Sequence, residues 1–550
     1  MHSFKRIKSG SLKLASSGKT LALIGAFVAG FLVFFAYGVL VGKYQYPPYS
    51  QVSPIYQKFY DLREALIGKS PLYSQEAIKL FEQSQREEDS KIALIAEVRD
   101  EVTDLILSNY EPYHILLGSP VGYILGYSVK SNSSANVYIH NVEPVMVDVY
   151  RLGRAKTKVN SLNILPPHRQ SSSFSPYLGL DWKASFTLDT NGYRSGYYLI
   201  ELTETESQNK YQIPFIVTPN NAPRVSLVSQ TNTMHAYNAF GGFAYYLDLR
   251  DHLYDDTVIT NYNDALKHYL PHDIHLPYAR PYISQNGNLK KILDVTFQTP
   301  LDIRKDTLPE DPFDDHLFRS EWNFAAFVED NLLDYGVYAD KDLQPGSPIL
   351  ESEIIIFNSH NEYWSDDMIQ AVRGYIDNGG KVIFAGGNAI YRGVKHTEHG
   401  MRILKDEIPS YISTPILGAD YTGDGFRTYA SYVVKEPNHW IFKDTGVTDG
   451  TEIGEYSANQ PQAGSRGEGS VGASGFETNK YNLYSEIYSE GFVILAIGKN
   501  DEGPAYMVFK ETDQGGWVFN SSSIAFSGSL FHDPVIDKMM LNLLSEQHDK

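Results

Sequence analysis

The chain of 550 residues contains no cysteine, and its charged residues are mainly acidic, with a formal net charge of −19. Without cysteine the chain forms neither disulfide bonds nor thiolate metal sites. Proteins that bind nucleic acids need basic patches that displace counterions, so the acidic balance argues against a nucleic-acid partner. The length is sufficient for several domains with complete hydrophobic cores.

Several catalytic signatures are also missing. The chain has neither the H-E-x-x-H zinc motif nor the H-x-E and C-x-x-C pair of the zinc deaminases. It has no phosphate-binding P-loop, and no G-x-S-x-G motif stands between an expected strand and an expected helix. These absences argue against the enzyme classes that depend on those motifs.

The first 42 residues have the pattern of a membrane anchor. Residues 1–19 carry lysine and arginine but no acidic residue, and residues 20–42 are uncharged and mostly apolar. As a helix the apolar segment spans roughly 35 Å, enough to cross a bilayer. Because the basic side stays cytoplasmic, we expect a single-pass protein of the inner (cytoplasmic) membrane whose remaining chain is periplasmic or extracellular. A cleavable signal peptide is the alternative, although its apolar core usually has only about 7–15 residues.

Two regions with different patterns follow the predicted anchor. In residues 43–112, apolar residues recur at helical spacing among many charged residues, which predicts a helical stalk or linker. Two alternatives stay open for this region: a helical hairpin that binds a partner, and a plain pair of packed helices. Residues 113–220 contain short strands separated by turn residues, which predicts an immunoglobulin-like β-sandwich. Such modules more often support or bind than catalyse. The segment 219–223 (PNNAP) is the expected boundary.

Residues 221–550 alternate between strands and helices, which predicts an α/β domain. Its centre is a βαβ unit, with two strands and one helix expected at 354–357, 381–385 and 365–378. Ser365 is the expected N-cap of this helix. Further elements are expected as a helix at 322–335, strands at 337–342, 491–497, 505–509 and 516–520, a long loop at 451–479 and a closing helix at 535–544.

The loops that follow the two strands of the βαβ unit are rich in polar and aromatic residues. In open α/β sheets, ligands bind beyond the carboxyl ends of the strands. The sequence therefore places a candidate site at loops 360–364 and 386–388.

Five short stretches of the chain share their order with a known family. They are AYNAFGG (236–242), RPY (280–282), SHNEYWS (359–365), GGKVIFAGGN (379–388) and GFE (475–477). In this respect the chain resembles the N,N-dimethylformamidase large (beta) subunit-like family, in its C-terminal domain. The similarity covers roughly residues 113–545 and includes the terminal stretch GGWVFNSSSIAFSGSL.

The resemblance implies an α/β domain like that of class I glutamine amidotransferases, without their nucleophilic cysteine. It also implies one mononuclear Fe(III) site whose two tyrosines and one glutamate correspond to Tyr237, Tyr282 and Glu362. In a chain with 40 tyrosines, composition alone favours a packing role for each of them. Two phenolates and one carboxylate, however, are hard anionic ligands that would neutralise a ferric ion, and a bound ion would polarise an amide carbonyl.

The resemblance also implies catalytic roles for four other residues. His360 would orient hydroxide or carry a proton, Asn388 would donate a hydrogen bond to the oxyanion, and Glu477 would act as a general acid or base. Lys405 corresponds to a family lysine only in a loose alignment, and a solvated surface charge is the alternative for it. The aromatic pair of HNEYW is expected to line the pocket.

We therefore expect a membrane-anchored, extracytoplasmic hydrolase of an amide C–N bond that acts on a small-molecule or envelope-derived amide. Two alternatives stay open: a non-catalytic cell-envelope binding or scaffold protein on a degenerate amidohydrolase domain, and a carbohydrate-directed envelope enzyme. The anchor, region 53–109 and the loop 451–479 depart from the dimethylformamide-hydrolysing enzyme, so its substrate does not transfer. Homo-oligomer formation and cleavage of the anchor are left open.

Overall fold

The computed structural model describes residues 112–115, 117–238, 240–242, 274–283, 316–331, 334–421, 428–459, 472–501 and 503–545. The predicted cytoplasmic tail, membrane anchor and stalk, apart from residue 112, lie outside the described residues and stay predictions. Within the described part of the chain, no helix is both long enough and apolar enough to cross a bilayer.

The strands between residues 113 and 218 belong to three sheets. As described, one sheet has the order β3-β11-β10-β5-β6, a second has the order β2-β4-β9, and a third, small sheet has the order β1-β7-β8. The bounds are β1 (Tyr113–His114), β2 (Val121–Ile124), β3 (Ser128–Lys130), β4 (Ser134–His140), β5 (Val145–Leu152), β6 (Lys156–Leu165), β7 (Ser173–Ser175), β8 (Gly179–Leu180), β9 (Phe186–Asp189), β10 (Gly196–Glu204) and β11 (Lys210–Thr218).

The first two of these sheets lie against each other, with β2 next to β11. Alternating residues of β5 explain the packing, because Val145, Val147 and Val149 are buried while Met146 between them is exposed. The strands expected in this region are therefore present. The immunoglobulin-like classification stays a prediction.

Residues 225–520 supply a mixed sheet with the order β14-β12-β15-β17-β28-β27-β26-β22-β23 in the described part. Strands β14 to β28 in this order run parallel, and the strands beyond β28 pair antiparallel. The bounds are β12 (Val225–Ser229), β14 (Tyr335–Ala339), β15 (Ile354–Ser359), β17 (Lys381–Gly386), β22 (Tyr432–Val434), β23 (Glu452–Ile453), β26 (Val493–Gly498), β27 (Tyr506–Glu511) and β28 (Trp517–Asn520).

The βαβ unit expected at the centre of this sheet is confirmed. Strands β15 and β17 pair in parallel, and helix α7 (Asp366–Asp377) connects them. The Ser365 hydroxyl accepts a hydrogen bond from the backbone N–H of Met368 at 3.3 Å, so this serine is the N-cap. After the helix the chain turns at Gly379, whose φ of 84° suits glycine.

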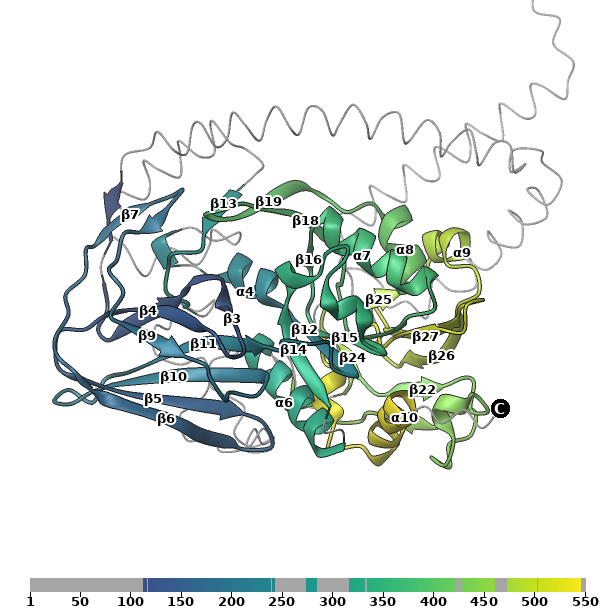
Figure 1. Ribbon diagram of the computed structural model, residues 1–550. Helices are drawn as coiled ribbons and strands as arrows, with labels where there is room; N and C mark the ends of the chain where they lie inside the picture. The colour runs from purple at the N-terminus through teal and green to yellow at the C-terminus, as the bar shows by residue number, and fades with distance from the viewer. Residues whose placement is uncertain are drawn as a thin grey trace, which may run out of the picture. The chain divides into compact units, whose positions relative to one another are not determined.

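Helices cover both faces of the parallel strands. Ile355 and Phe357 of β15 belong to the same apolar cluster as residues of α7 and α8 (Ser410–Leu417). Ile354 and Ile356 belong to the cluster that contains residues of α6 (His316–Asn331) and α10 (Pro534–Ser545). Figure 1 shows α7 and α8 on one side of these strands and α6 and α10 on the other. A parallel strand that is covered on both faces needs the continuous apolar run that β15 has.

The remaining described α-helices and strands belong neither to the large mixed sheet nor to the sheets of residues 113–218. They are α4 (Thr231–Tyr237), α9 (Leu483–Tyr488), a sheet of order β13-β19-β18-β16, and the pairs β20-β25 and β21-β24. Their strand bounds are β13 (Ile274–Pro277), β16 (Tyr363–Trp364), β18 (Arg392–His396), β19 (Gly400–Glu407), β20 (Asp420–Tyr421), β21 (Tyr429–Ala430), β24 (Ser474–Gly475) and β25 (Asn479–Lys480).

Two expectations differ in detail from the structure. The helix expected at 322–335 is α6, which ends at Asn331, and Tyr335 already begins β14 because its YGVYA segment pairs with β12. The loop expected at 451–479 contains the short strands β23 and β24, while residues 460–471 lie outside the described part. The closing helix is confirmed as α10. The glutamine amidotransferase-like classification stays a prediction.

Candidate active site

The order of the parallel strands places a topological switch point between β12 and β15. The chain leaves β12 toward β14 on one side, whereas it leaves β15 toward β17 on the other. Ligands of open α/β sheets bind at such a switch point, beyond the carboxyl ends of the strands. Helix α4 follows β12 there, and the loop 360–364 follows β15.

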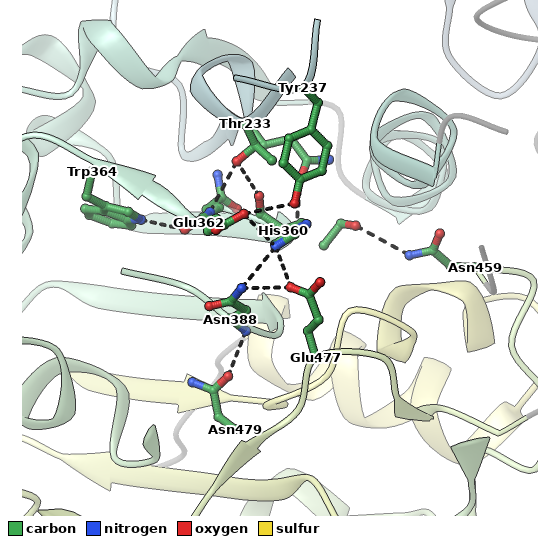
Figure 2. A network of polar contacts seen from close by, with 12 residues as sticks. Thr233, Tyr237, His360, Glu362, Trp364, Asn388, Asn459, Glu477 and Asn479 are labelled. Carbon is green, nitrogen blue, oxygen red and sulfur yellow. Dashed lines mark hydrogen bonds and ion pairs between the residues drawn. The ribbon is translucent and has the colours of Figure 1, made fainter. Parts of the chain in front are cut away.

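Two side chains on one face of α4 contact the loop after β15. The Thr233 hydroxyl donates to the carbonyl oxygen of His360 at 2.7 Å and accepts from the backbone N–H of Glu362 at 3.2 Å. One helical turn later, the Tyr237 hydroxyl donates to Oε2 of Glu362 at 2.9 Å. Figure 2 shows the phenol ring of Tyr237 directed at the Glu362 carboxylate. Residues four apart on a helix lie on the same face, so α4 presents both contacts together.

His360 lies between two carboxylates from different parts of the chain. Its Nε2 atom is 2.9 Å from Oε2 of Glu477 and 3.3 Å from Oε2 of Glu362. The Asn388 side-chain amide donates to the same Glu477 oxygen at 2.7 Å and lies 3.5 Å from His360 Nε2. The backbone N–H of Asn388 in turn donates to Oδ1 of Asn479 at 2.7 Å. Figure 2 shows how these side chains converge from three loops on His360.

Burial and mutual charge shift the pKa values in this cluster. All five residues of the cluster, Tyr237, His360, Glu362, Asn388 and Glu477, are buried, and none of these residues is more than 7 % exposed. Burial raises the pKa of Glu362 to about 7, although the neighbouring His360 opposes the shift. For His360 burial alone would lower the pKa, but the charge and hydrogen bond of Glu477 raise it above its ordinary value. Burial would raise the pKa of Glu477, yet His360 and Asn388 together hold it below its usual range. The charged forms of His360 and Glu477 therefore stabilise each other, whereas burial favours the neutral form of Glu362.

Backbone strain is concentrated in this cluster. Ser359, Asn388, Phe476 and Glu477 all have positive φ angles, of 62°, 47°, 57° and 51°. Non-glycine residues rarely adopt this conformation, and it persists where the surrounding structure enforces it, often at functional sites. Two of these four residues, Asn388 and Glu477, direct their side chains to His360, so the strained backbone lies where the cluster is assembled.

The glycine pair of the GGN motif lets these loop ends approach each other. A Cβ atom on Gly386 would overlap the carbonyl oxygen of Ser359, and one on Gly387 would overlap the carbonyl oxygen of Glu477. Only glycine permits backbones to lie this close. The close approach of these backbones therefore requires the two glycines of the motif at these positions.

The RPY segment is held against the end of α4. Arg280 donates to the carbonyl oxygens of His235 at 2.8 Å and Phe240 at 3.1 Å. Asn238, the residue after Tyr237, donates to the carbonyl oxygen of Pro281 at 2.9 Å. These bonds fix the backbone on either side of the two predicted tyrosine ligands relative to each other.

Tyr282 is buried at this junction. Its ring lies edge-on to the ring of Tyr127, with centroids 6.1 Å apart, and its carbonyl oxygen accepts from the Tyr211 hydroxyl at 2.6 Å. Both Tyr127 and Tyr211 belong to residues 113–218, which we call the β-rich part of the chain. The structure therefore brings the segment with Tyr282 beside the segment with Tyr237, and its role as a ligand stays a prediction.

Lys405 lies in β19, but its side chain is outside the described part, so its predicted role stays a prediction.

Three residues that the sequence analysis does not single out also belong to the site: Thr233, Asp340 and Asn479. A helical pattern over 231–237 would have indicated Thr233, because it stands one turn before Tyr237. Nothing in the local sequence indicates Asp340 or Asn479.

The Tyr237 phenol and the Glu362 carboxylate offer neighbouring oxygen donors of the kind that hard cations prefer. Within the described residues, no group of three or more His, Asp or Glu side chains is placed to hold a metal ion. The Tyr237 hydroxyl and Glu362 Oε2 are 2.9 Å apart, a separation that suits two oxygen ligands at about 2 Å from one ion. The buried Oδ1 atom of Asn388 has no hydrogen-bond partner in the described structure, which leaves an acceptor for a bound molecule.

A cavity of about 430 Å³ lies apart from this cluster. Tyr278, Lys341 and His396 contribute to its lining, and none of the predicted site residues does. Its walls also carry the carboxyl groups of Asp367 and Glu398. This mixture of charges defines no ligand class.

The buried His–Glu cluster lies at the switch point of the parallel strands, beyond the carboxyl ends of β12 and β15. A family model described as N,N-dimethylformamidase beta subunit-like, C-terminal, matches residues 146–537. The chain belongs to this family, and the matched range includes every predicted ligand and catalytic residue. No curated protein matches the chain.

Proposed function

We propose that this protein hydrolyses an amide C–N bond at the cluster around His360. One observation carries the proposal: His360 Nε2 lies between the carboxylates of Glu477 and Glu362, and Tyr237 contacts the second carboxylate. Amide hydrolysis needs a group that activates water and a group that protonates the leaving amine. Membership of the dimethylformamidase-like family supports the same reaction class.

Tyr237, Tyr282 and Glu362 are the residues that would hold a mononuclear Fe(III) ion. Phenolate and carboxylate oxygens suit a hard trivalent cation, and a cation stabilises the ionised form of a phenol whose pKa is normally about 10. When bound, the ion would supply Lewis-acid activation of the amide carbonyl and of the attacking water. The 2.9 Å contact between Tyr237 and Glu362 supports this assignment.

The remaining side chains handle protons and orient the substrate. His360 is paired with Glu477, so its imidazolium form is stabilised and holds a proton at Nε2 for the leaving amine. Glu477 is kept in place by the Asn388 amide. The same amide has a second N–H, which is the candidate donor to the developing oxyanion. Since all these groups are buried, they act in a medium where charges interact strongly.

We further propose that residues 20–42 anchor the protein in the inner membrane and that the catalytic part acts outside the cytoplasm. The basic residues before the apolar segment support this orientation, and the absence of cysteine suits it. The substrate class is then a small or envelope-derived amide.

Metal analysis and amide hydrolysis by the purified full-length chain test the proposal. We expect about one iron per chain, a visible absorption band from tyrosinate bound to iron, and amine release from short amides. Tyr237→Phe should weaken or shift the band, because only Tyr282 would remain as a phenolate ligand. The matched control Tyr198→Phe should keep the band, because the Tyr198 hydroxyl bonds to the Arg194 carbonyl within residues 113–218, away from the site. A colourless protein that takes up no ferric iron and releases no amine would contradict the proposal. Binding of an envelope partner that survives Glu362→Ala in such a protein would support the scaffold alternative.

A further inference from the structure

Helix α4 carries Tyr237 but has little to stabilise it on its own. It has seven residues, and its N-cap residue Gln230 makes no side-chain capping bond. Isolated helices of this length are unstable in water, so contacts with other elements hold it in place. Those contacts decide where the phenol of Tyr237 lies.

Thr233 makes one of these contacts. Its hydroxyl group donates to the carbonyl oxygen of His360 and accepts from the N–H of Glu362, at 2.7 and 3.2 Å. The Thr233 side chain is fully buried. Its hydroxyl group acts both as a donor and as an acceptor, and both hydrogen bonds are made to the same loop. Because Tyr237 follows one turn later on the same face, this single hydroxyl sets how α4 meets the loop that carries Glu362.

Asp340 makes a second contact at the other end of α4. Its Oδ2 atom accepts from the backbone N–H of Asn232 at 2.9 Å, and its Oδ1 atom accepts from the side-chain amide of Asn361 at 3.4 Å. The backbone N–H of Asp340 also donates to the Thr231 hydroxyl at 3.1 Å. Asp340 thus supplies the acceptor that the first turn of α4 lacks and connects it to the residue between His360 and Glu362.

We propose that Thr233 and Asp340 are positioning residues that fix α4 against loop 360–362 and so set the separation between the Tyr237 hydroxyl and the Glu362 carboxylate. This inference rests on the proposed function insofar as these two groups hold a metal ion. Residues that orient metal ligands without touching the metal typically change metal affinity or activity by about 10- to 100-fold. Both residues act through hydrogen bonds to backbone or neighbouring side chains, not through contact with substrate.

Three variants of the full-length protein test the role of Thr233. Thr233→Val keeps the branched shape and removes the hydroxyl, whereas Thr233→Ser keeps the hydroxyl. Thr190→Val is the matched control, because Thr190 is also buried and its hydroxyl donates to the Lys130 carbonyl at 2.8 Å and accepts from the Ser133 N–H at 3.1 Å in the β-rich part. We expect Thr233→Val to bind iron about 10- to 100-fold more weakly in chelator competition, with a weaker or shifted visible band. Thr233→Ser and Thr190→Val should match the wild type.

The rate of amide hydrogen exchange in the metal-free proteins is a second measurement, and it does not depend on iron. In Thr233→Val, segments 231–237 and 360–364 should exchange at least tenfold faster than in Thr190→Val. If Thr233→Val does not fold, Asp340→Ala replaces it, because it removes both acceptor oxygens that hold the Asn232 N–H and the Asn361 amide and should release loop 360–364. Unchanged exchange in both segments overturns the proposal. A wild-type chain that binds no iron overturns the proposed metal site instead, and the exchange result still decides the role of Thr233.

Discussion

The Nε2 atom of His360 lies 2.9 Å from Oε2 of Glu477, with both side chains buried. Glu477 is not among the predicted iron ligands, so its charge and the metal can be separated by mutation. We expect Glu477→Gln to lower kcat for amide hydrolysis by about 100- to 10,000-fold, the usual contribution of a general acid–base system. Iron content should stay at the wild-type level. Loss of iron together with activity would show that Glu477 acts on the metal site and not on proton transfer.

Glu362→Gln, unlike Glu477→Gln, should remove the bound iron. Its carboxylate contacts both Tyr237 and His360, and the neutral amide is a poor ligand for a ferric ion. We expect both the iron and the visible band to disappear. Exposed Glu490 provides the control, because Glu490→Gln should leave iron content unchanged. An iron-replete Glu362→Gln protein with the wild-type spectrum would contradict the ligand assignment.

Asp340 should make the stability of the metal-free protein depend on pH. Burial raises the pKa of Asp340 from 3.8 to about 8, while the N–H groups of Asn232 and Asn361 partly oppose the shift. A carboxyl group whose pKa is raised on folding stabilises the folded state below its unfolded pKa, and this contribution is lost as the pH rises toward the folded pKa. Relative to Asp340→Asn, the unfolding temperature of the wild type should therefore fall between about pH 4 and pH 8. Parallel curves for the two proteins across this range would contradict the burial effect.

The two glycines Gly386 and Gly374 should respond oppositely to substitution by alanine. A Cβ on Gly386 overlaps the Ser359 carbonyl, so Gly386→Ala should destabilise the protein by about 1–3 kcal/mol and weaken amide hydrolysis. Gly374 lies in α7 with open space around it, so Gly374→Ala should stabilise the protein by about 0.5–1 kcal/mol. Chemical denaturation of both variants measures the difference. If both variants changed the free energy of unfolding equally, the ends of β15 and β17 could move apart without loss of stability, which would contradict this account.

The βαβ unit could be predicted from the sequence because its signals are local. The apolar run 354–356, the cap at Ser365 and the turn at Gly379 each act within a few residues. Strand β6 has no comparable signal, because it is an edge strand whose residues are mostly exposed and polar and form no apolar run. The predicted helix 322–335 extends beyond the end of α6, because pairing with β12, which lies far away in the sequence, makes Tyr335 part of a strand.

The site could be predicted only in part for a similar reason. The motifs around Tyr237, Glu362 and Asn388 are short and distinctive, and the resemblance to a family connects them. Thr233 and Asp340 are ordinary residues in sequence, and their significance comes from hydrogen bonds to the loop after β15, which follows them at a distance along the chain. Local patterns carry no information about such contacts.

An anomalous difference map at the iron absorption edge, from crystals of the iron-loaded full-length protein, tests the central claim most directly. The account predicts one peak at about 2 Å from the phenol oxygens of Tyr237 and Tyr282 and from a carboxylate oxygen of Glu362. An iron peak elsewhere, or none in protein saturated with ferric iron, would contradict it.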